Sequence, residues 1–280
     1  MSAYSDTTFR ANDYNSFRPT YSNDVFKFIN QYHTGGHDLA VDLGCGPGQA
    51  SYPLTEYFKK VIGTDLSQTM INAANGKRTD EYKGKIEFRQ SPGESLSFLE
   101  DNSVDLFTAA QCVHWFDHDN FFKEINRVLK PGGTLAYWGY VDPVFNVPEA
   151  DKIVDDYTYE DPTKLGPYWE PGRFILRKLL KDVQPPQELF DDIKVYEDKP
   201  GVPSSQQSPL QIKREIPLEF YQKYVQTWSS YHSWKKANPD APDVSDQLIE
   251  ELKAKVKWNN NTKVNIQWLT VLKLARKRLK

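Results

Sequence analysis

The segment 39–48 combines residue types and spacing that could bind a small ligand. A short apolar run ends at Asp42, and glycines follow at alternate positions, including Gly44 and Gly46. Glycine accepts positive φ, and its missing Cβ lets a ligand lie against the backbone. The G-x-G-x-G spacing differs from the dinucleotide and P-loop patterns, and no lysine follows. The pattern favours a ligand with a cationic amino-acid end over a phosphate, although an ordinary glycine-rich loop has the same composition.

A second acid follows the glycines at the distance expected within a βαβ unit. Residues 60–65 form a short apolar run that ends in Asp65, about 20 residues past the turn. An acid at this place accepts hydrogen bonds from the ribose hydroxyls of a nucleoside. Leu66 and Met70 come directly afterwards and are candidates for an apolar bed under the base.

A third group of polar and aromatic residues follows a predicted strand at residues 103–110. This group contains Gln111, His114 and Trp115. Ligands of open α/β sheets bind at the carboxyl ends of the strands, so these residues are expected beside the same ligand. A lone histidine is more often structural than catalytic, but the position of His114 favours a catalytic role.

The elements that would position these residues alternate along the chain. Predicted strands cover residues 39–43, 60–65, 85–89, 103–110 and 134–140, with helices at 22–32, 67–75 and 119–129. Ser67 is a plausible N-cap of the second helix. Beyond residue 141 the alternation weakens, with short strands expected at 193–196 and 210–216, one aromatic helix at 218–234, another helix at 245–256, and a terminal strand at 264–275. This order predicts an α/β, doubly wound, mostly parallel sheet.

Composition excludes several classes of protein. The chain has 280 residues, 39% hydrophobic and 14% aromatic, with a formal net charge of −3. A charge of this sign gives no general attraction to nucleic acid or to anionic membranes. Cys45 and Cys112 are too few for a disulfide framework and form no metal motif, so no metal is expected. Without a membrane-length apolar run or a signal peptide after Met1, we expect a cytoplasmic protein with no stable membrane association.

The combined pattern of Asp42, the glycines and Asp65 resembles that of class I S-adenosylmethionine-dependent methyltransferases. The resemblance implies a Rossmann-like sheet of seven strands and S-adenosyl-L-methionine as cofactor. It also implies an N-terminal segment that folds over the cofactor, and in this chain Tyr14 and Arg18 lie at helical i, i+4 spacing. The residues implied in cofactor binding are Tyr14, Arg18, Asp42, Gly44, Gly46, Asp65, Leu66, Met70, Glu94 and Gln111.

One departure from the methyltransferase pattern concerns the adenine. Pro92 stands where related enzymes commonly carry an acid that meets the adenine amino group. The contact therefore passes to the backbone or to a neighbour such as Glu94. Glu94 is equally suited to be a loop acid or a charge at a helix N-terminus.

Five further stretches narrow the resemblance to the fungal group that contains trans-aconitate methyltransferase and the cantharidin-resistance methyltransferase. They are residues 14–19, 113–116, 138–143, 166–170 and 227–234, so the similarity runs nearly end to end. Enzymes of this group convert a carboxylate of a small acid into a methyl ester. The strand-end position favours a catalytic role for His114 beside the transferable methyl. An acid acceptor needs an aromatic pocket with a few donors, and the candidates are Trp115, Trp138, Tyr140, Tyr168, Trp169, Arg173, Trp228, Tyr231 and His232.

The resulting organisation has four parts. Residues 1–37 form an N-terminal cap over the cofactor, and 38–141 form the cofactor-binding core. Residues 142–258 form substrate-side insertions and a helical lid, and 259–280 return to the sheet as its terminal strand. We expect a monomer or a weak homodimer.

Three alternatives for the function follow from these residues. A carboxylate is ionised at neutral pH and needs no base, only a pocket with donors, for which Arg173 is preferred over Arg177 and Arg214. An amine, hydroxyl or lipid acceptor would need His114 or His232 as a base. The third alternative is a protein that binds the cofactor without turnover.

Overall fold

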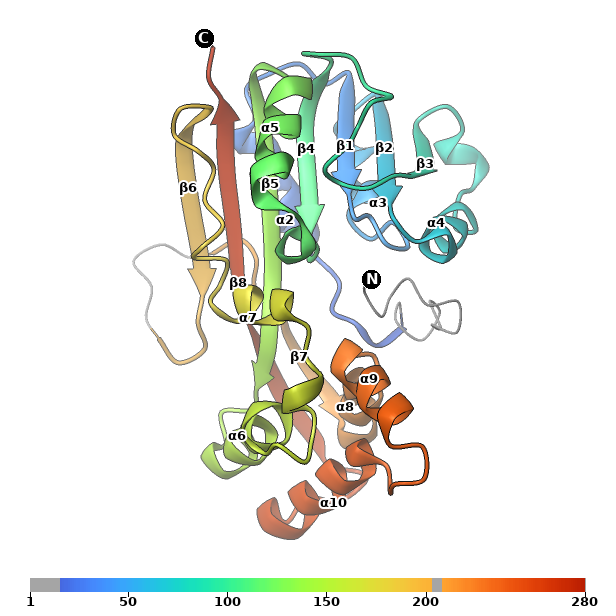
Figure 1. Cartoon of the computed structure of the whole chain (residues 1–280), viewed down its shortest axis with the longest axis vertical. Coiled ribbons are helices and arrows are strands. Elements are labelled where there is room, and N and C mark those ends of the chain that lie inside the picture. Colours follow the sequence, from blue (N-terminus) through green and yellow to red (C-terminus); the bar gives the residue numbers. More distant parts are fainter. Residues whose placement is uncertain (1–15, 203–207, 280) are drawn as a thin grey trace.

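Eight strands form one sheet, with the order β3-β2-β1-β4-β5-β8-β6 and with β7 paired to β8 outside this path (Figure 1). The computed structural model describes residues 16–202 and 208–279. Its strands are β1 (Leu39–Leu43), β2 (Lys60–Asp65), β3 (Ile86–Gln90), β4 (Val104–Ala110), β5 (Leu129–Val144), β6 (Phe190–Asp198), β7 (Lys213–Pro217) and β8 (Lys263–Lys277). Its α-helices are α2 (Asn23–Tyr32), α3 (Ser51–Leu54), α4 (Gln68–Asn75), α5 (His118–Val128), α6 (Pro148–Asp155), α7 (Pro171–Arg177), α8 (Leu218–Val225), α9 (Ser229–Ala237) and α10 (Val244–Val256). Shorter helical turns are η2 (Asp80–Tyr82), η3 (Val113–Trp115), η4 (Asp156–Glu160) and η5 (Gly166–Tyr168).

Strands β1 to β5 are parallel and have helices on both faces. Val41 of β1 pairs with Ile62 of β2 and with Phe107 of β4, and all three side chains are buried. Residues of α2 and α3 pack on one face of the sheet, and residues of α5 pack on the other. Strands covered on both faces consist of nearly continuous apolar residues, which is why β1 and β4 read as apolar runs.

Strands β5 and β8 are long and antiparallel, and they carry the sheet beyond its parallel half. Their register runs from Thr134 opposite Arg276 to Val144 opposite Gln267. Figure 1 shows both strands reaching the lower end of the molecule, where α6, α8, α9 and α10 gather. The predicted α/β, doubly wound, mostly parallel sheet with a C-terminal strand is confirmed. Seven strands form its continuous order, and β7 is the eighth.

The prediction of one aromatic helix over residues 218–234 is wrong. Helix α8 ends at Val225, and α9 begins at Ser229. Between them Thr227 Oγ1 donates to the carbonyl of Tyr224 at 2.6 Å, and Trp228 is extended, with φ −76° and ψ 144°. A threonine side chain that bonds a nearby carbonyl competes with helix continuation. The break sets the direction in which Trp228 projects.

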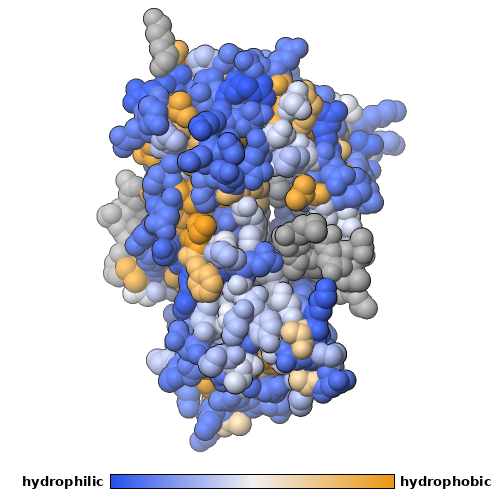
Figure 2. All heavy atoms as spheres, viewed as in Figure 1, coloured by the Kyte–Doolittle hydropathy of each residue, from blue (hydrophilic) through white to orange (hydrophobic). Residues whose placement is uncertain are grey.

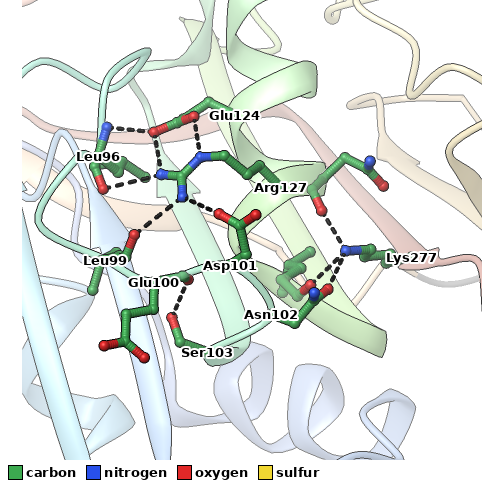
Figure 3. Close-up of polar contacts among 11 residues, drawn as sticks. Leu96, Leu99, Glu100, Asp101, Asn102, Ser103, Glu124, Arg127 and Lys277 are labelled. Atoms are coloured by element: carbon green, nitrogen blue, oxygen red, sulfur yellow. Dashed lines mark hydrogen bonds and ion pairs between the residues drawn. The ribbon is translucent and has the colours of Figure 1, made fainter.

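A polar network holds the loop of residues 91–103 against α5 (Figure 3). The Arg127 guanidinium donates to both carboxylate oxygens of Glu124, to Asp101 and to two loop carbonyls. At the same end of the structure, Lys277 of β8 donates through Nζ to the carbonyl of Leu129, the first residue of β5, at 2.7 Å. The network fixes the far end of a loop whose first residues border the cavity described below.

The face of the molecule shown in Figure 2 agrees with a composition in which 39% of the residues are hydrophobic. Figure 2 shows a mostly hydrophilic face with small, separate apolar areas. Among the residues that the structure describes, no helix combines the length and apolar character needed to cross a membrane. The same residues contain no group of three or more His, Cys, Asp or Glu side chains arranged to hold a metal ion.

Candidate active site

A cavity of about 420 Å³ lies at the carboxyl ends of the parallel strands. Its volume is within the range of small-molecule sites. We call it the larger cavity, and it is lined by Gly44, Gly46, Asp65, Leu66, Ser67, Met70, Ser91, Pro92, Gly93, Glu94, Ala110, Gln111, Cys112, Trp115, Phe116 and Glu170. Residues from four separate strand ends therefore meet at one edge of the sheet, as the parallel order requires.

The glycine turn needs glycine for two different reasons. Gly44 has φ +57°, and a Cβ there would lie 2.6 Å from the Cβ of Cys112. Gly46 has φ +53°, and a Cβ there would meet nothing within 4 Å. The first glycine lets β4 approach the turn, and the second presents bare backbone to the open larger cavity.

Asp42 lies behind the turn and does not line the larger cavity. Its two carboxylate oxygens accept hydrogen bonds from Ser51 Oγ at 2.6 Å and Thr108 Oγ1 at 2.7 Å. Burial raises the pKa of Asp42 to about 6, although both hydroxyl donors oppose the shift. Asp42 thus ties the turn to α3 and β4 and acts through them.

Asp65 joins the glycine turn to α4 and also lines the larger cavity. One carboxylate oxygen accepts from the backbone N–H of Gly46 at 2.9 Å, and the other accepts from Ser67 N at 2.8 Å. Burial raises the pKa of Asp65, while the two backbone donors oppose the shift. Ser67 is the N-cap of α4, as predicted, and its Oγ accepts from Met70 N at 3.4 Å.

The part of the larger cavity beyond Asp65 is mainly apolar. Leu66 is 58% exposed there, an unusual exposure for a large apolar side chain, and Met70 is buried beside it. Pro92 and Glu94 face them from the loop after β3. A Glu94 oxygen accepts from the backbone N–H of Asp117, the N-cap residue of α5, at 3.1 Å. Glu94 therefore combines the helix-terminus role with a position on the cavity wall.

Gln111 separates the larger cavity from a second one. Its backbone has φ +59°, which is uncommon for a residue with a side chain. The side-chain amide accepts from Tyr140 N at 2.7 Å and donates to Tyr140 O at 2.9 Å. These bonds fix the Gln111 side chain between the two cavities, both of which it lines together with Trp115.

The second cavity, which we call the smaller cavity, lies between the sheet and the lower helices. It is lined by Arg18, Gln111, His114, Trp115, Trp169, Arg173, Leu176, Trp228 and Ser229. Arg18 is buried there and donates to the carbonyl of Thr227 at 2.9 Å. The segment before α2 is thus attached to the lower helices, and its arginine borders the smaller cavity rather than the larger one.

Arg173 is held in the wall of the smaller cavity by three contacts. Its guanidinium forms an ion pair with Asp142 and donates through Nε to Tyr159 Oη at 2.9 Å. Tyr159 Oη in turn donates to Asp142 at 2.6 Å. The guanidinium carbon also lies 4.5 Å from the ring centre of Trp169. Ion pair, hydrogen bond and cation–π contact together leave the guanidinium little freedom.

His114 is buried in the same wall and is neutral at physiological pH. Burial, with the positive charges of Arg173 and Arg18, lowers its pKa to about 3. Its Nδ1 is buried and has no hydrogen-bond partner among the described residues. A histidine in this state is a poor proton acceptor near pH 7.

Several residues predicted to bind the acceptor lie elsewhere. Trp138 and Tyr140 are buried in the core of the sheet. Tyr168 Oη accepts from Asn238, and Tyr231 Oη donates to Asp243 at 2.7 Å.

Four other candidates have different outcomes. His232 packs edge-on against the neighbouring tyrosine ring and does not line the smaller cavity. Arg177 pairs with an aspartate at the surface, and Arg214 donates to Thr20. Tyr14 lies outside the described residues.

Other residues on the cavity walls were not singled out from the sequence. Ser91, Gly93, Phe116 and Glu170 border the larger cavity, and Ser229 borders the smaller one. The need for glycine at position 93 is visible only in the structure, because a Cβ there would lie 2.7 Å from the Phe116 ring. Glu170 follows Trp169 in the sequence. An acidic residue beside an aromatic one, beyond the predicted core, was the sequence feature that could have indicated it.

Comparisons with known proteins agree with this geometry. Residues 41–137 match the family model described as the methyltransferase domain. The Saccharomyces cerevisiae protein CRG1, named as a probable S-adenosylmethionine-dependent methyltransferase, is 33% identical over 99% of this chain and 98% of its own length. The chain belongs to the S-adenosylmethionine-dependent methyltransferases.

Two further similarities extend over most of this methyltransferase. A Dictyostelium discoideum protein assigned as a methyltransferase is 32% identical over 86% of the chain and 83% of its own length. A solved structure from Anaeromyxobacter dehalogenans, assigned as a type II methyltransferase, has a TM-score of 0.70 and 26% identity, covering 93% of this chain and 98% of that one. The cofactor is therefore S-adenosylmethionine, and the larger cavity with its bare glycine backbone fits a ligand of this kind.

Proposed function

We propose that this methyltransferase transfers the methyl group of S-adenosylmethionine to a carboxylate oxygen of a small organic acid. The observation that carries the proposal is the smaller cavity, whose wall brings the neutral His114 together with the guanidinium groups of Arg18 and Arg173. Positive charge attracts a carboxylate, and a histidine with a pKa of about 3 is unsuited to deprotonate an amine or a hydroxyl.

In this proposal the larger cavity holds the cofactor. The bare backbone of Gly44 and Gly46 meets the methionine end, and Asp65 accepts from the ribose hydroxyls. Leu66 and Met70 lie under the base, and Glu94 or the neighbouring backbone meets the adenine. The bound cofactor would supply an electrophilic methyl group on a sulfonium. The side chains of the protein would bind the acid, position it and exclude water.

The chemistry asked of these side chains is positioning. A carboxylate arrives ionised, so the bond to the methyl carbon forms as the carbon–sulfur bond breaks, and no proton has to be removed. Holding two reactants in near-attack geometry supplies about 7–11 kcal/mol of the barrier. Gln111 and Trp115 border both cavities, so the methyl would pass between them.

Arg173 is the preferred carboxylate clamp in this scheme. Asp142 balances its charge before the acid enters, which reduces the cost of burying the guanidinium. Its fixed position, set also by Tyr159, lowers the entropy lost when the acid binds. Arg18 supplies the second guanidinium from the segment before α2.

Residues 142–258 would then act as the lid of the acceptor site. Trp169, next to η5, and Trp228, at the start of α9, line the smaller cavity and lie 5.6 Å apart between ring centres. Aromatic walls exclude water from a reaction between an anion and a sulfonium, and exclusion of water strengthens the electrostatic contacts inside the site.

The alternative with a histidine base now depends on His114 alone, because His232 does not line the smaller cavity. It requires the bound acceptor to raise the pKa of His114, which burial lowers to about 3. The two cavities adjoin through Gln111 and Trp115, which argues against a protein without turnover. The smaller cavity has a volume of only about 20 Å³, room for about one water molecule, so in this proposal an acid enters as Trp169 and Trp228 move apart.

The proposal is tested with the purified enzyme, cofactor labelled in the methyl group, and a panel of acceptors. The panel contains trans-aconitate, a cantharidin-type diacid, other small mono-, di- and tricarboxylic acids, and matched amines and alcohols. A methyl ester releases labelled methanol in mild alkali, whereas N-methyl and ether products do not. Label in alkali-stable products alone would refute carboxyl methylation.

A further inference from the structure

Helix α9 begins at the wall of the smaller cavity. Its first residue, Ser229, lines that cavity, and the helix runs for nine residues to Ala237. No side chain among the described residues caps its N-terminus, where His232 N donates to Trp228 O at 3.3 Å. The N-terminal N–H groups of a helix carry partial positive charge and bind anions.

Two polar side-chain atoms at this helix end are buried and have no partner among the described residues. They are the indole Nε1 of Trp228 and the Oγ of Ser230. Trp228 is 1% exposed, and it lines the smaller cavity. A buried N–H or hydroxyl without a partner is rare in folded proteins and calls for an explanation.

We propose that the start of α9 is the carboxylate-binding end of the acceptor site, with Trp228 Nε1–H as its specific donor. This inference rests on the proposed function, since it names what the acceptor binds to. An indole N–H can only donate, so its partner must be an acceptor atom. The helix end and the guanidinium of Arg173 favour an anionic oxygen over a neutral one.

The arrangement also predicts selectivity against amines. A protonated amine would meet an indole donor, a helix N-terminus and two guanidinium groups, all of which repel it. A carboxylate oxygen pairs with the indole N–H that is otherwise left unsatisfied. Sites built to pair a buried group reject analogues that leave it unpaired far more strongly than apolar pockets do.

The test uses two conservative variants that each remove one buried, unpartnered donor. Trp228→Phe removes the indole N–H at the cavity, and Tyr221→Phe removes a hydroxyl that is equally buried and unpartnered but lines neither cavity. For the panel acid with the highest kcat/KM, we expect Trp228→Phe to raise KM about 10-fold or more, the loss typical of a hydrogen bond to a charged group. Cofactor affinity should stay unchanged, because Trp228 does not line the larger cavity. The melting temperature should fall, because a phenyl ring leaves part of the buried indole's space empty beside Trp169 and Tyr224. Tyr221→Phe should leave KM unchanged.

Binding of the panel acids is also measured by calorimetry with S-adenosylhomocysteine present, so that the readout does not need turnover. If the wild type binds an acid, Trp228→Phe weakens that binding, and no ester forms, the proposed function fails and the anion-binding end of α9 stands. If the wild type forms an ester with the same KM as Trp228→Phe, the inference fails and the proposed function stands. Equal effects of Trp228→Phe and Tyr221→Phe, or a wild type that binds no acid at all, also overturn the inference.

Discussion

Replacement of His114 by asparagine should leave methyl transfer to a carboxylic acid largely intact. The substitution keeps a polar side chain of similar reach in the wall of the smaller cavity but removes the ring that could act as a base. Because burial and two arginines lower the pKa of His114 to about 3, the ring is already neutral throughout the physiological range. The wild-type kcat should therefore be independent of pH where the acid is ionised.

If His114 were a general base, the rise of kcat with pH would follow from the ordinary titration of histidine. A catalytic base with the usual pKa of about 6.5 would be about one quarter deprotonated at pH 6.0 and almost fully deprotonated at pH 8.5. The wild-type kcat would then rise about fourfold over this range. A general base also contributes about 10²–10⁴-fold to the rate, so His114→Asn would lose that factor. Positioning alone predicts a loss of about 10-fold or less.

The assay measures kcat at saturating cofactor and acid from pH 6.0 to 8.5 for both proteins. The carboxyl behind the glycine turn titrates at the lower end of this range, because burial raises the pKa of Asp42 to about 6 and about half of it is protonated at pH 6.0. Cofactor affinity measured at each pH serves as the control. A fourfold rise for the wild type, with a flat profile and a loss of 100-fold or more for His114→Asn, would refute the reasoning.

Three further predictions follow from single contacts. Asp65→Ala should weaken cofactor binding by about 10-fold or more in calorimetry and also lower the melting temperature, because two backbone N–H groups lose a charged acceptor; unchanged affinity would show that the nucleoside is placed wrongly. Trp169→Ala should lower kcat/KM for the acid while cofactor affinity stays within a few-fold, whereas Tyr231→Phe, which loses a bond to Asp243, should lower stability alone. Burial lowers the pKa of Lys273 to about 8. The unfolded chain therefore binds more protons than the folded one between pH 8 and about 10.5, and urea unfolding should show the wild type gaining stability over Lys273→Met as pH rises through this interval.

Local patterns were sufficient to predict the residues around the larger cavity. The turn at Gly44 and Gly46 and the N-cap at Ser67 depend on backbone geometry within a few residues, so the residue types reveal them directly. The parallel order then brings strand ends together at one edge, which is why residues chosen for their place after a strand now line one cavity. Asp42 shows the limit of this reasoning. It lies inside β1, one residue before the strand ends, and only the packing of α3 and β4 decides that it faces them.

The walls of the smaller cavity could not be predicted in the same way. Trp138 and Tyr140 are as aromatic as Trp228, yet they lie in a strand covered on both faces, and their burial depends on what packs there. The break between α8 and α9 carries no glycine or proline, so helical periodicity ran through it. That break decides where Trp228 projects, and with it the wall of the smaller cavity.

From the sequence alone, the residue pattern determined the class of fold, the strand ends that meet, and the resemblance to a methyltransferase. Only the tertiary structure decided that Arg18, His114 and Arg173 share one buried cavity, although they come from three distant segments. The physical reason is that a strand or a turn depends on nearby residues, whereas the pKa of His114 depends on burial and on charges brought from elsewhere in the chain.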